Sequence, residues 1–295
     1  MIHYTNCPVC GSSDIRKVFS VVDHTVSKQQ FEILECNFCT LRFTQDVPDE
    51  DLIKTFYKSE DYISHTNTSK GIINRLYQQV RKKTMKQKRH LIENMTGIKK
   101  GALLDVGSGT GAFVNEMRKH GWQVTGLEPE DDARKIAREF YKLQLDDDLL
   151  FYKLPLQSFD VITLWHVLEH VHDLHAYVEQ LKNLLKEKGK LFIAVPNYTS
   201  KDAEIYKEHW AAYDVPRHLY HFSPPAMKKL LENHGLKIDD YQLMWYDSFY
   251  ICLLSSKYKS GKPNWISALF NGLVSNFKAM DDHKKCSSLI YIISK

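Results

Sequence analysis

Apolar runs in the middle of the chain alternate with helical patterns. Runs at 101–106 and 122–128 predict two strands, and runs at 159–165 and 190–196 predict two more. The last two runs are almost continuously apolar, as parallel strands covered on both faces should be. After the first run, Phe113, Val114 and Met117 share one face of a predicted helix. This alternation predicts a parallel sheet with right-handed crossovers, which is a Rossmann-like α/β fold.

Start and stop residues mark two further helices. Asp173 is a candidate N-cap for a helix whose leucine-rich stripe runs to Leu185, and Gly189 should close it. Ser223 precedes two prolines that suit a first helical turn, and this second helix should end near Gly235. Both helices fit between or after the predicted strands of the sheet.

Four segments follow from these patterns. Residues 1–45 carry short strand-like stretches at 17–22 and 31–34, residues 46–98 form a polar helical connector, and residues 99–240 hold the alternating elements. Residues 241–295 complete the domain with an amphipathic helix and a last strand at 287–294. We expect this helix to pack on the core, and a surface for a membrane, substrate or partner is the alternative. Its apolar face comprises Trp265, Ile266, Leu269, Phe270, Leu273, Val274, Phe277 and Met280.

Composition and charge narrow the class of protein. The 295 residues carry a net charge of +4, which is too mild to imply nucleic acid, and ten basic residues against the single acid Glu93 gather in 67–100. We expect that stretch to be a solvated helix face, and contact with phosphate or an anionic surface is the alternative. Neither a membrane span nor a secretory signal is evident, so a cytoplasmic location is expected. Two single cysteines, Cys252 and Cys286, lie in apolar surroundings and are expected in the core.

Four other cysteines form two Cys-x-x-Cys pairs, Cys7 with Cys10 and Cys36 with Cys39. In a cytosolic chain such pairs indicate metal before disulfide. Four thiolates satisfy a tetrahedral zinc ion completely, so the site would be structural and closed. A segment of this size cannot bury a sufficient core, and zinc should supply most of its folding energy. The sequence therefore predicts an N-terminal zinc ribbon.

A glycine-rich loop follows the first predicted strand. Gly107, Gly109 and Gly111 stand where the strand turns into a helix, and residues without Cβ allow the backbone to approach a ligand closely. Asp105 precedes the loop, and Glu128 ends the next strand, where an acid can accept both hydroxyls of a ribose. The spacing G-x-G-x-G differs from the G-x-G-x-x-G of dinucleotide sites, which favours S-adenosylmethionine (SAM) over NAD.

This loop, with EPEDDARKIA at 128–137 and FDVITLWHVLEHVHD at 159–173, resembles the class I SAM-dependent methyltransferases, and in particular the ubiquinone-biosynthesis O-methyltransferase-like group. The resemblance covers about 99–240 and implies that SAM contacts Asp105, Gly107, Gly109 and Glu128, with an acid from 146–148 near the adenine. The candidate cofactor residues also include Gly111, Asp147, Asp148 and His166. The ribbon looks like that of sugar C-methyltransferases, whose further C-terminal domain has no counterpart here.

The methyl acceptor should bind beyond the ends of the strands, where ligands of open α/β sheets lie. His166, Glu169 and His170 follow one strand, and the loop 197–223 follows the next. We take His166, His170 and His218 as catalytic candidates, with His166 and His218 as the leading general bases. The pattern H-x-x-E-H matches a protease zinc signature, but it straddles a strand end instead of lying on a helix. The resemblance implies that His166, Glu169 and His170 can hold a divalent metal, and orienting or structural roles are the alternative.

Arg217 is the candidate for an anionic group on the acceptor, because its guanidinium lies among aromatic and imidazole side chains in the sequence. A structural ion pair with Asp214 is the equal alternative. The function that these features predict is methylation of a small or lipid- or sugar-linked molecule at oxygen or carbon. The alternatives are a zinc-ribbon RNA methyltransferase and a non-catalytic SAM-binding module. The N/D-P-P-Y tetrad of amino-directed nucleic-acid methylation is absent, so nucleic acid is not the expected partner; oligomeric state is left open.

Overall fold

The computed structural model describes residues 1–57 and 72–295, which fall into two compact units. Unit 1 contains 1–57, His166–Val178 and Ile193–Ile293, and unit 2 contains 72–165, Glu179–Phe192 and Ser294–Lys295. These units differ from the segments predicted above, because the ribbon shares unit 1 with later parts of the chain. The basic stretch at 67–100, which was predicted to be a solvated helix face, lies partly outside the described residues.

Parallel strands form the centre of unit 2. Strand β4 (Ala102–Val106) pairs in parallel with β5 (Gln123–Leu127) on one side and with β6 (Phe159–Trp165) on the other. Asp105 stands opposite Gly126 and Thr163 in these two registers. The interior of β6 is almost wholly buried, as its apolar run predicted. The predicted α/β fold with a parallel-rich sheet is confirmed.

The remaining strands of this sheet are β7 (Leu185–Pro196), β9 (Lys237–Leu243) and β10 (Ser288–Ser294), and the strand order is β5-β4-β6-β7-β10-β9. The last strand of the chain is therefore inserted between two earlier ones, which confirms the prediction at 287–294. β10 is buried along nearly its whole length.

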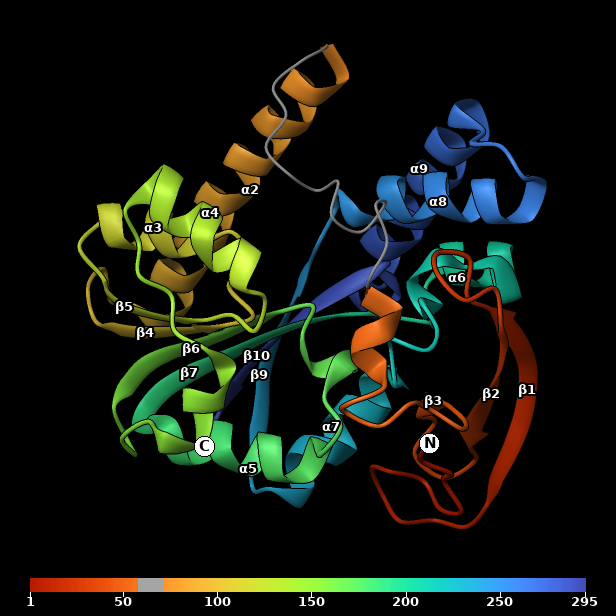
Figure 1. Ribbon diagram of the computed structural model, residues 1–295, viewed down its shortest axis with the longest axis horizontal. Coiled ribbons are helices and arrows are strands. Elements are labelled where there is room, and N and C mark those ends of the chain that lie inside the picture. The colour runs from red at the N-terminus through yellow and green to blue at the C-terminus, as the bar shows by residue number, and fades with distance from the viewer. Residues whose placement is uncertain (58–71) are drawn as a thin grey trace. The chain divides into compact units, whose positions relative to one another are not determined.

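The helices and short 3-10 segments connect these strands (Figure 1). The α-helices are α2 (Ile72–Thr96), α3 (Ala112–Lys119), α4 (Asp131–Tyr141), α5 (Leu174–Leu184), α6 (Lys201–Tyr206), α7 (Pro224–Asn233), α8 (Asp247–Ser260) and α9 (Trp265–Asp281). The 3-10 segments are η1 (Ile53–Tyr57), η2 (Asp148–Lys153), η3 (Leu168–His170), η4 (Lys207–His209), η5 (Ala211–Tyr213) and η6 (His283–Lys285).

Two predicted helix ends have different outcomes. Helix α7 begins as expected, because Ser223 Oγ accepts a hydrogen bond from the backbone N–H of Ala226. The helix expected to reach Gly189 ends instead at Leu184, and the chain enters β7 at Leu185. The backbone N–H groups of residues 157 and 158 donate hydrogen bonds to the carbonyls of Asn183 and Leu184. These last carbonyls of the helix are therefore satisfied by the segment that precedes β6.

Strands of the N-terminal segment form an antiparallel sheet in unit 1. They are β1 (Ile15–Val22), β2 (Gln30–Cys36) and β3 (Arg42–Thr44), in that order, and β8 (Tyr220–His221) adds a fourth strand at the edge of β3. Phe43 stands opposite Tyr220 in this pairing. The predicted ribbon boundary at residue 45 therefore does not separate an independent unit, because the loop after β7 returns to extend its sheet.

Each unit has its own buried core. Aromatic and aliphatic side chains of unit 1 cluster around Phe31, Trp210 and Tyr213, together with Ile251 and Cys252. Unit 2 has a smaller cluster, which comprises Val114, Ala137, Leu143 and Leu145. Both single cysteines, Cys252 and Cys286, are buried as predicted.

The expectation that α9 packs through its large apolar face is wrong. Seven of the eight predicted face residues are exposed, and the buried positions of α9 are the small residues Ala268, Gly272, Ser275 and Ala279. α9 packs on α8 and α6 (Figure 1). A Cβ at Gly272 would lie 2.7 Å from Phe249 Cδ1, so the approach to α8 is too close for a larger residue. Among the described residues, no helix has the length and apolar character to cross a membrane.

Candidate functional site

The glycine-rich loop of unit 2 has a backbone that glycine tolerates best. Gly107, Gly109 and Gly111 have φ of 72°, 53° and 76°, in the left-handed region. A Cβ at Gly111 would lie 3.0 Å from Ala137 Cβ. The N–H groups of Gly107 and Ser108 donate to the carbonyl of Leu127, which ties the loop to the end of β5. The loop thus leaves β4 as a tight turn that opens helix α3.

Glu128 lies directly after β5 and is almost fully buried. One carboxylate oxygen accepts the N–H of Gly109 at 2.6 Å, and the other accepts the N–H of Glu130 at 3.0 Å. Burial raises the pKa of Glu128, and these two N–H donors oppose that shift. Glu128, the acid predicted to hold a ribose, is therefore fixed by hydrogen bonds against the glycine-rich loop that a cofactor would contact.

Asp105 lies inside the sheet of unit 2 at the end of β4. Thr163 Oγ1 donates to its carboxylate at 2.6 Å, and the carboxylate is 1% exposed. Burial raises the pKa of Asp105 to about 6, and the hydrogen bond from Thr163 acts in the other direction. A carboxylate desolvated in this way gains from an ammonium partner such as the amino group of a bound amino acid.

The acids at 146–148 follow a short parallel bridge between Leu127 and Asp146. Asp147 caps η2, where its side chain accepts the N–H of Leu149, and it lies 3.1 Å from Arg134. Asp148 and Leu149 are exposed. The segment therefore lies beside the end of β5.

Four cysteine sulfurs of unit 1 gather at one point. Cys7 Sγ and Cys39 Sγ lie 3.5 Å apart, as do Cys10 Sγ and Cys36 Sγ, and all four atoms lie within 4.8 Å of one another. A tetrahedral zinc with bonds of about 2.3 Å requires sulfurs about 3.8 Å apart, whereas a disulfide requires about 2.0 Å. The arrangement fits four thiolate ligands.

Both cysteine pairs are held in similar turns. The N–H of Gly11 donates to the carbonyl of Cys7, and the N–H of Thr40 donates to that of Cys36, both at 2.9 Å. Gly11 and Thr40 each have a positive φ, of 73° and 61°. The N–H of Cys39 lies 3.5 Å from Cys36 Sγ, which points a donor at a prospective thiolate.

His166 follows β6 in unit 1 and is held between two acids. Its ring nitrogens lie 3.3 Å from Glu169 Oε1 and 3.1 Å from Asp247 Oδ2. Burial alone would lower the pKa of His166, but these carboxylates raise it to about 10. A ring that carries both protons at neutral pH has no lone pair for a substrate proton. The geometry therefore disfavours the prediction that His166 is the general base and favours an orienting role.

The φ of His166 is 59°, which is uncommon for a residue with a side chain. Its N–H donates to the carbonyl of Ala194 at 2.9 Å, so the turn after β6 is fixed against β7. Backbone in sparsely populated conformations persists where the surroundings determine it, and such positions concentrate at functional sites.

Glu169, His170 and His218 form a second cluster in unit 1. One ligand atom from each lies within 4.8 Å of the others, and Glu169 is fully buried. The Nδ1–H of His170 donates to the carbonyl of Arg217 at 2.9 Å, and that of His218 donates to the carbonyl of Ala212 at 2.8 Å. A neutral imidazole held in this way keeps Nε2 as an acceptor.

One oxygen of this cluster is orphaned. Within the part of the chain that the structure describes, the buried Glu169 Oε2 has no hydrogen-bond partner. Burial alone would raise the pKa of Glu169, but the hydrogen bond from His166 lowers it, so the carboxylate is ionised at neutral pH. Burial lowers the pKa of His170 to about 4, and this ring is neutral. An ionised carboxylate and a neutral imidazole such as that of His170 are donors that a divalent metal requires. The Glu169 oxygen without a partner fits such an ion.

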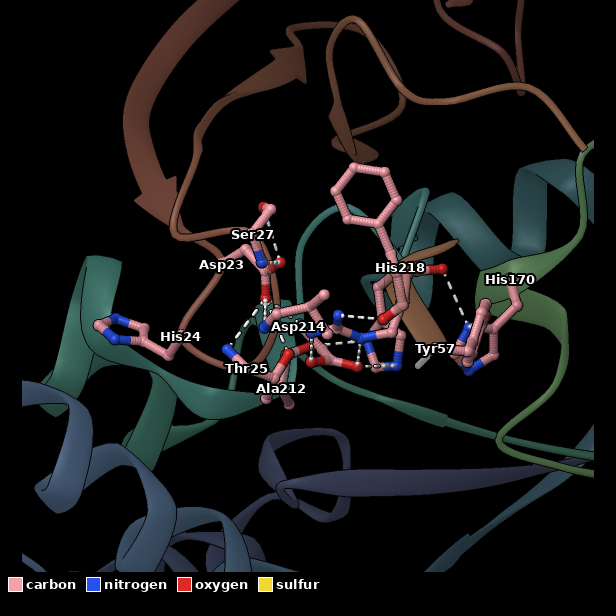
Figure 2. A network of polar contacts seen from close by, with 12 residues as sticks. Asp23, His24, Thr25, Ser27, Tyr57, His170, Ala212, Asp214 and His218 are labelled. Atoms are coloured by element: carbon pink, nitrogen blue, oxygen red, sulfur yellow. Dashed lines mark hydrogen bonds and ion pairs between the residues drawn. The ribbon is translucent and has the colours of Figure 1, made fainter. Parts of the chain in front are cut away.

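Arg217 is enclosed by two acids, Asp23 and Asp214, which are labelled in Figure 2. Its guanidinium donates to both oxygens of Asp214 at 3.0 and 2.6 Å, to Asp23 at 3.2 Å and to the carbonyl of Phe56 at 2.9 Å. The residue is 1% exposed. The guanidinium is occupied by protein partners, which corrects the expectation that it lies open to an anionic acceptor and favours the structural ion pair.

The sequence interpretation missed three residues around this cluster. Asp247 begins α8 and contacts His166, Tyr57 OH lies 3.0 Å from His170 Nδ1 (Figure 2), and Asp23 pairs with Arg217. Each is separated from its partner by at least 81 residues. No local motif signals such pairs, because they arise only when distant elements of unit 1 pack together.

Known proteins resemble this chain in sequence and in fold. A family model described as a methyltransferase domain matches residues 77–241, which is more than half of the chain. The ubiquinone biosynthesis O-methyltransferase of Glaesserella parasuis is 36% identical over 110 residues, covering 34% of this chain and 47% of that protein. The corresponding enzyme of Xanthomonas axonopodis is 30% identical over 160 residues, covering 49% of this chain and 66% of that protein. The chain thus spans less than two thirds of either relative.

A solved structure from Galdieria sulphuraria, of a protein assigned as a sarcosine dimethylglycine methyltransferase, has a TM-score of 0.50 and 14% identity. The alignment covers 75% of this chain and 87% of that protein, and at this identity the likeness shows the fold alone. The chain belongs to the methyltransferase domain family. The chain carries a class I SAM-dependent methyltransferase domain, and its glycine-rich loop lies in unit 2.

Proposed function

We propose that this methyltransferase transfers the methyl group of SAM to a hydroxyl oxygen of a small molecule, free or linked to a lipid or sugar. The two sequence relatives described above are named as O-methyltransferases of ubiquinone biosynthesis, and this supports the class of reaction. The observation that carries the proposal is the buried Glu169, which clusters with His170 and His218 and has one carboxylate oxygen without a partner in the described residues. Carbon as the acceptor atom is the alternative that the sequence left open.

The cofactor would be held in unit 2 by the loop and acids described above. Asp105 would pair with the amino group of SAM, Glu128 would accept the ribose hydroxyls, and Asp147 or Asp148 would lie near the adenine. The open backbone of Gly107 and Gly109 supports close approach of the methionine part. Methyl transfer is an in-line displacement, so the chain must align the acceptor oxygen with the sulfonium methyl.

The cluster in unit 1 would bind and activate the acceptor. Glu169, His170 and His218 would hold a divalent cation, which supplies a positive charge that favours the alkoxide form of a hydroxyl. Without a bound cation, His218 would be the candidate for accepting the proton, because its Nδ1–H is fixed on Ala212 and a neutral ring would keep Nε2 as an acceptor. His166, held by Asp247, would orient Glu169.

Metal binding tests this proposal without measuring turnover. Chelated protein titrated with Mn²⁺ or Mg²⁺ should bind a divalent ion by calorimetry, and Glu169→Gln should weaken that affinity about 10-fold or more. Asp240→Asn on β9 is the matched control and should bind metal like the wild type. Equal metal affinity in Glu169→Gln and the wild type would remove the metal from the proposal and leave His218 as base alone. Methylation of RNA but of no small molecule would contradict the proposed acceptor class.

We also propose that Cys7, Cys10, Cys36 and Cys39 bind one structural zinc ion. The spacing of their sulfurs and the paired turns support four thiolate ligands with no open position. Zinc would therefore stabilise the sheet β1-β2-β3-β8 and take no part in methyl transfer. The cytoplasmic location expected from the sequence stays a prediction.

A further inference from the structure

The outer face of α9 has an unusual composition for a surface helix. No charged residue occurs in 265–277. Of the sixteen exposed large hydrophobic residues in the described part of the chain, seven belong to this helix. They are Trp265, Ile266, Leu269, Phe270, Leu273, Phe277 and Met280. Contiguous apolar surface of this kind marks an interaction site.

Polar side chains of α9 are turned inward instead. Asn271 Nδ2 donates to Tyr206 OH at 2.9 Å, and Ser275 Oγ donates to Asp202. Asn276 accepts from Ser248 of α8 at 3.0 Å. A helix that faces water has the opposite arrangement, with large apolar residues inside and polar ones outside. The arrangement of α9 suits an apolar medium on its outer side.

Lysines flank this apolar face. Lys257, Lys259 and Lys262 are exposed around the turn between α8 and α9. Lys278, near the far end of α9, is also exposed and pairs with Asp281 at 3.7 Å. Aromatic residues such as Trp265 and Phe270 suit the boundary between lipid headgroups and acyl chains, and lysines suit anionic headgroups. The three lysines at the turn between α8 and α9 give this end of the face a positive charge, which favours an anionic surface as the occupant.

We propose that the exposed face of α9 docks on the surface of a bilayer that contains anionic phospholipids. The helix lies along the bilayer, with its apolar side chains among the acyl chains and the flanking lysines at the headgroups. This inference stands apart from the proposed methyl acceptor. It rests on the exposed residues and charges of α8 and α9, which lie beyond the family match at 77–241.

Flotation of the full chain with vesicles tests the proposal. We expect binding to vesicles of phosphatidylcholine with phosphatidylglycerol, and a partition coefficient lowered at least about 10-fold by Phe270→Gln with Phe277→Gln, because two aromatic side chains no longer leave water. The matched control is Phe140→Gln on α4, since Phe140 is 62% exposed and Phe277 is 63% exposed. The control should bind vesicles like the wild type. Circular dichroism should show both variants folded, since every substituted side chain is exposed.

Charge and depth are tested in the same assay. Lys259→Gln with Lys262→Gln should weaken binding to anionic vesicles, whereas Lys228→Gln on α7 should not. Brominated lipids should quench Trp265, and Trp265→Phe should remove that part of the quenching. Wild-type protein that does not bind anionic vesicles would overturn the proposal, and so would equal vesicle binding by the wild type and the Phe270/Phe277 variant. A third contrary outcome is a wild-type dimer in sedimentation that this variant abolishes, with no binding to vesicles.

Discussion

Two buried carboxylates, Asp105 and Glu169, and the partly buried Asp214 differ in their partners. Asp105 has one hydroxyl donor from Thr163, Glu169 keeps one oxygen without a partner in the described structure, and Asp214 is saturated by Arg217. Burying a carboxylate is costly unless it is paired or hydrogen-bonded. Asp105 and Glu169 therefore have capacity left for a ligand, whereas Asp214 has a structural partner already.

The pKa of Asp105 predicts how SAM binding depends on pH. Burial raises this pKa to about 6. Below that pH the carboxyl is protonated and no longer attracts an ammonium, so the Kd for SAM should rise about tenfold for each pH unit below 6. Titration calorimetry between pH 5 and pH 8 measures the effect. Asp105→Asn should bind more weakly at neutral pH, with little dependence on pH; a steep pH dependence in this variant would contradict the assignment.

Arg217 is predicted to act on stability. Arg217→Met leaves Asp23 and Asp214 buried without their cation, and breaking a buried pair in this way costs about 3–5 kcal/mol of unfolding free energy. Urea unfolding measures the loss. The matched control is Lys17→Met, which removes an exposed ion pair with Glu32 and should cost less than about 1 kcal/mol. An unchanged stability with a raised KM for the acceptor would restore the substrate-binding interpretation.

The same ion pair has a pH dependence of known sign. Burial would raise the pKa of Asp214, but the hydrogen bonds from Arg217 lower it below that of an unfolded aspartate. The stabilisation is therefore complete above about pH 4 and is lost as the pH falls through the lowered folded pKa. The difference between wild type and Arg217→Met should shrink in that range.

At the scale of elements, the two turns that hold the cysteine pairs are short, and we expect a bound zinc ion to stabilise them. Cys36→Ser removes one of four thiolates, and we expect loss of zinc with destabilisation of β1, β2 and β3, because these strands enclose a small core. Elemental analysis measures zinc, and hydrogen exchange measures the protection of the strands. Cys252→Ser, a buried cysteine of α8, should keep the full zinc content. Purified wild-type protein without zinc would refute the prediction.

Elements defined by local spacing could be predicted from the sequence, and those defined by distant packing could not. The glycine loop, the cysteine pairs and the start of α7 are encoded within a few residues of one another. Periodicity also identified the residues that share a face of α9. It could not tell which face the protein covers, because that depends on the small residues that let α8 and α6 approach. The contact of Asp247 with His166 could not be predicted from the sequence either, because it too depends on how distant elements pack together.

On the scale of the molecule, the parts do not follow the order of the chain. Unit 1 takes the N-terminal strands, the residues after β6 and most of the chain after residue 192. The glycine-rich loop lies in unit 2, and the cluster of Glu169, His170 and His218 lies in unit 1 with the four cysteines. Two chemically distinct sites of unit 1 therefore depend on one set of strands and loops.

The pairing of β3 with β8 restricts how the gene for such a chain can be rearranged. Residues 1–45 have the appearance of a detachable module, yet their removal would uncover the edge of β8 and leave Arg217 without Asp23. An exchange of N-terminal segments between related chains would have to carry the loop at 210–223 with it to give a folded hybrid. The ribbon and the loop after β7 are expected to be inherited together.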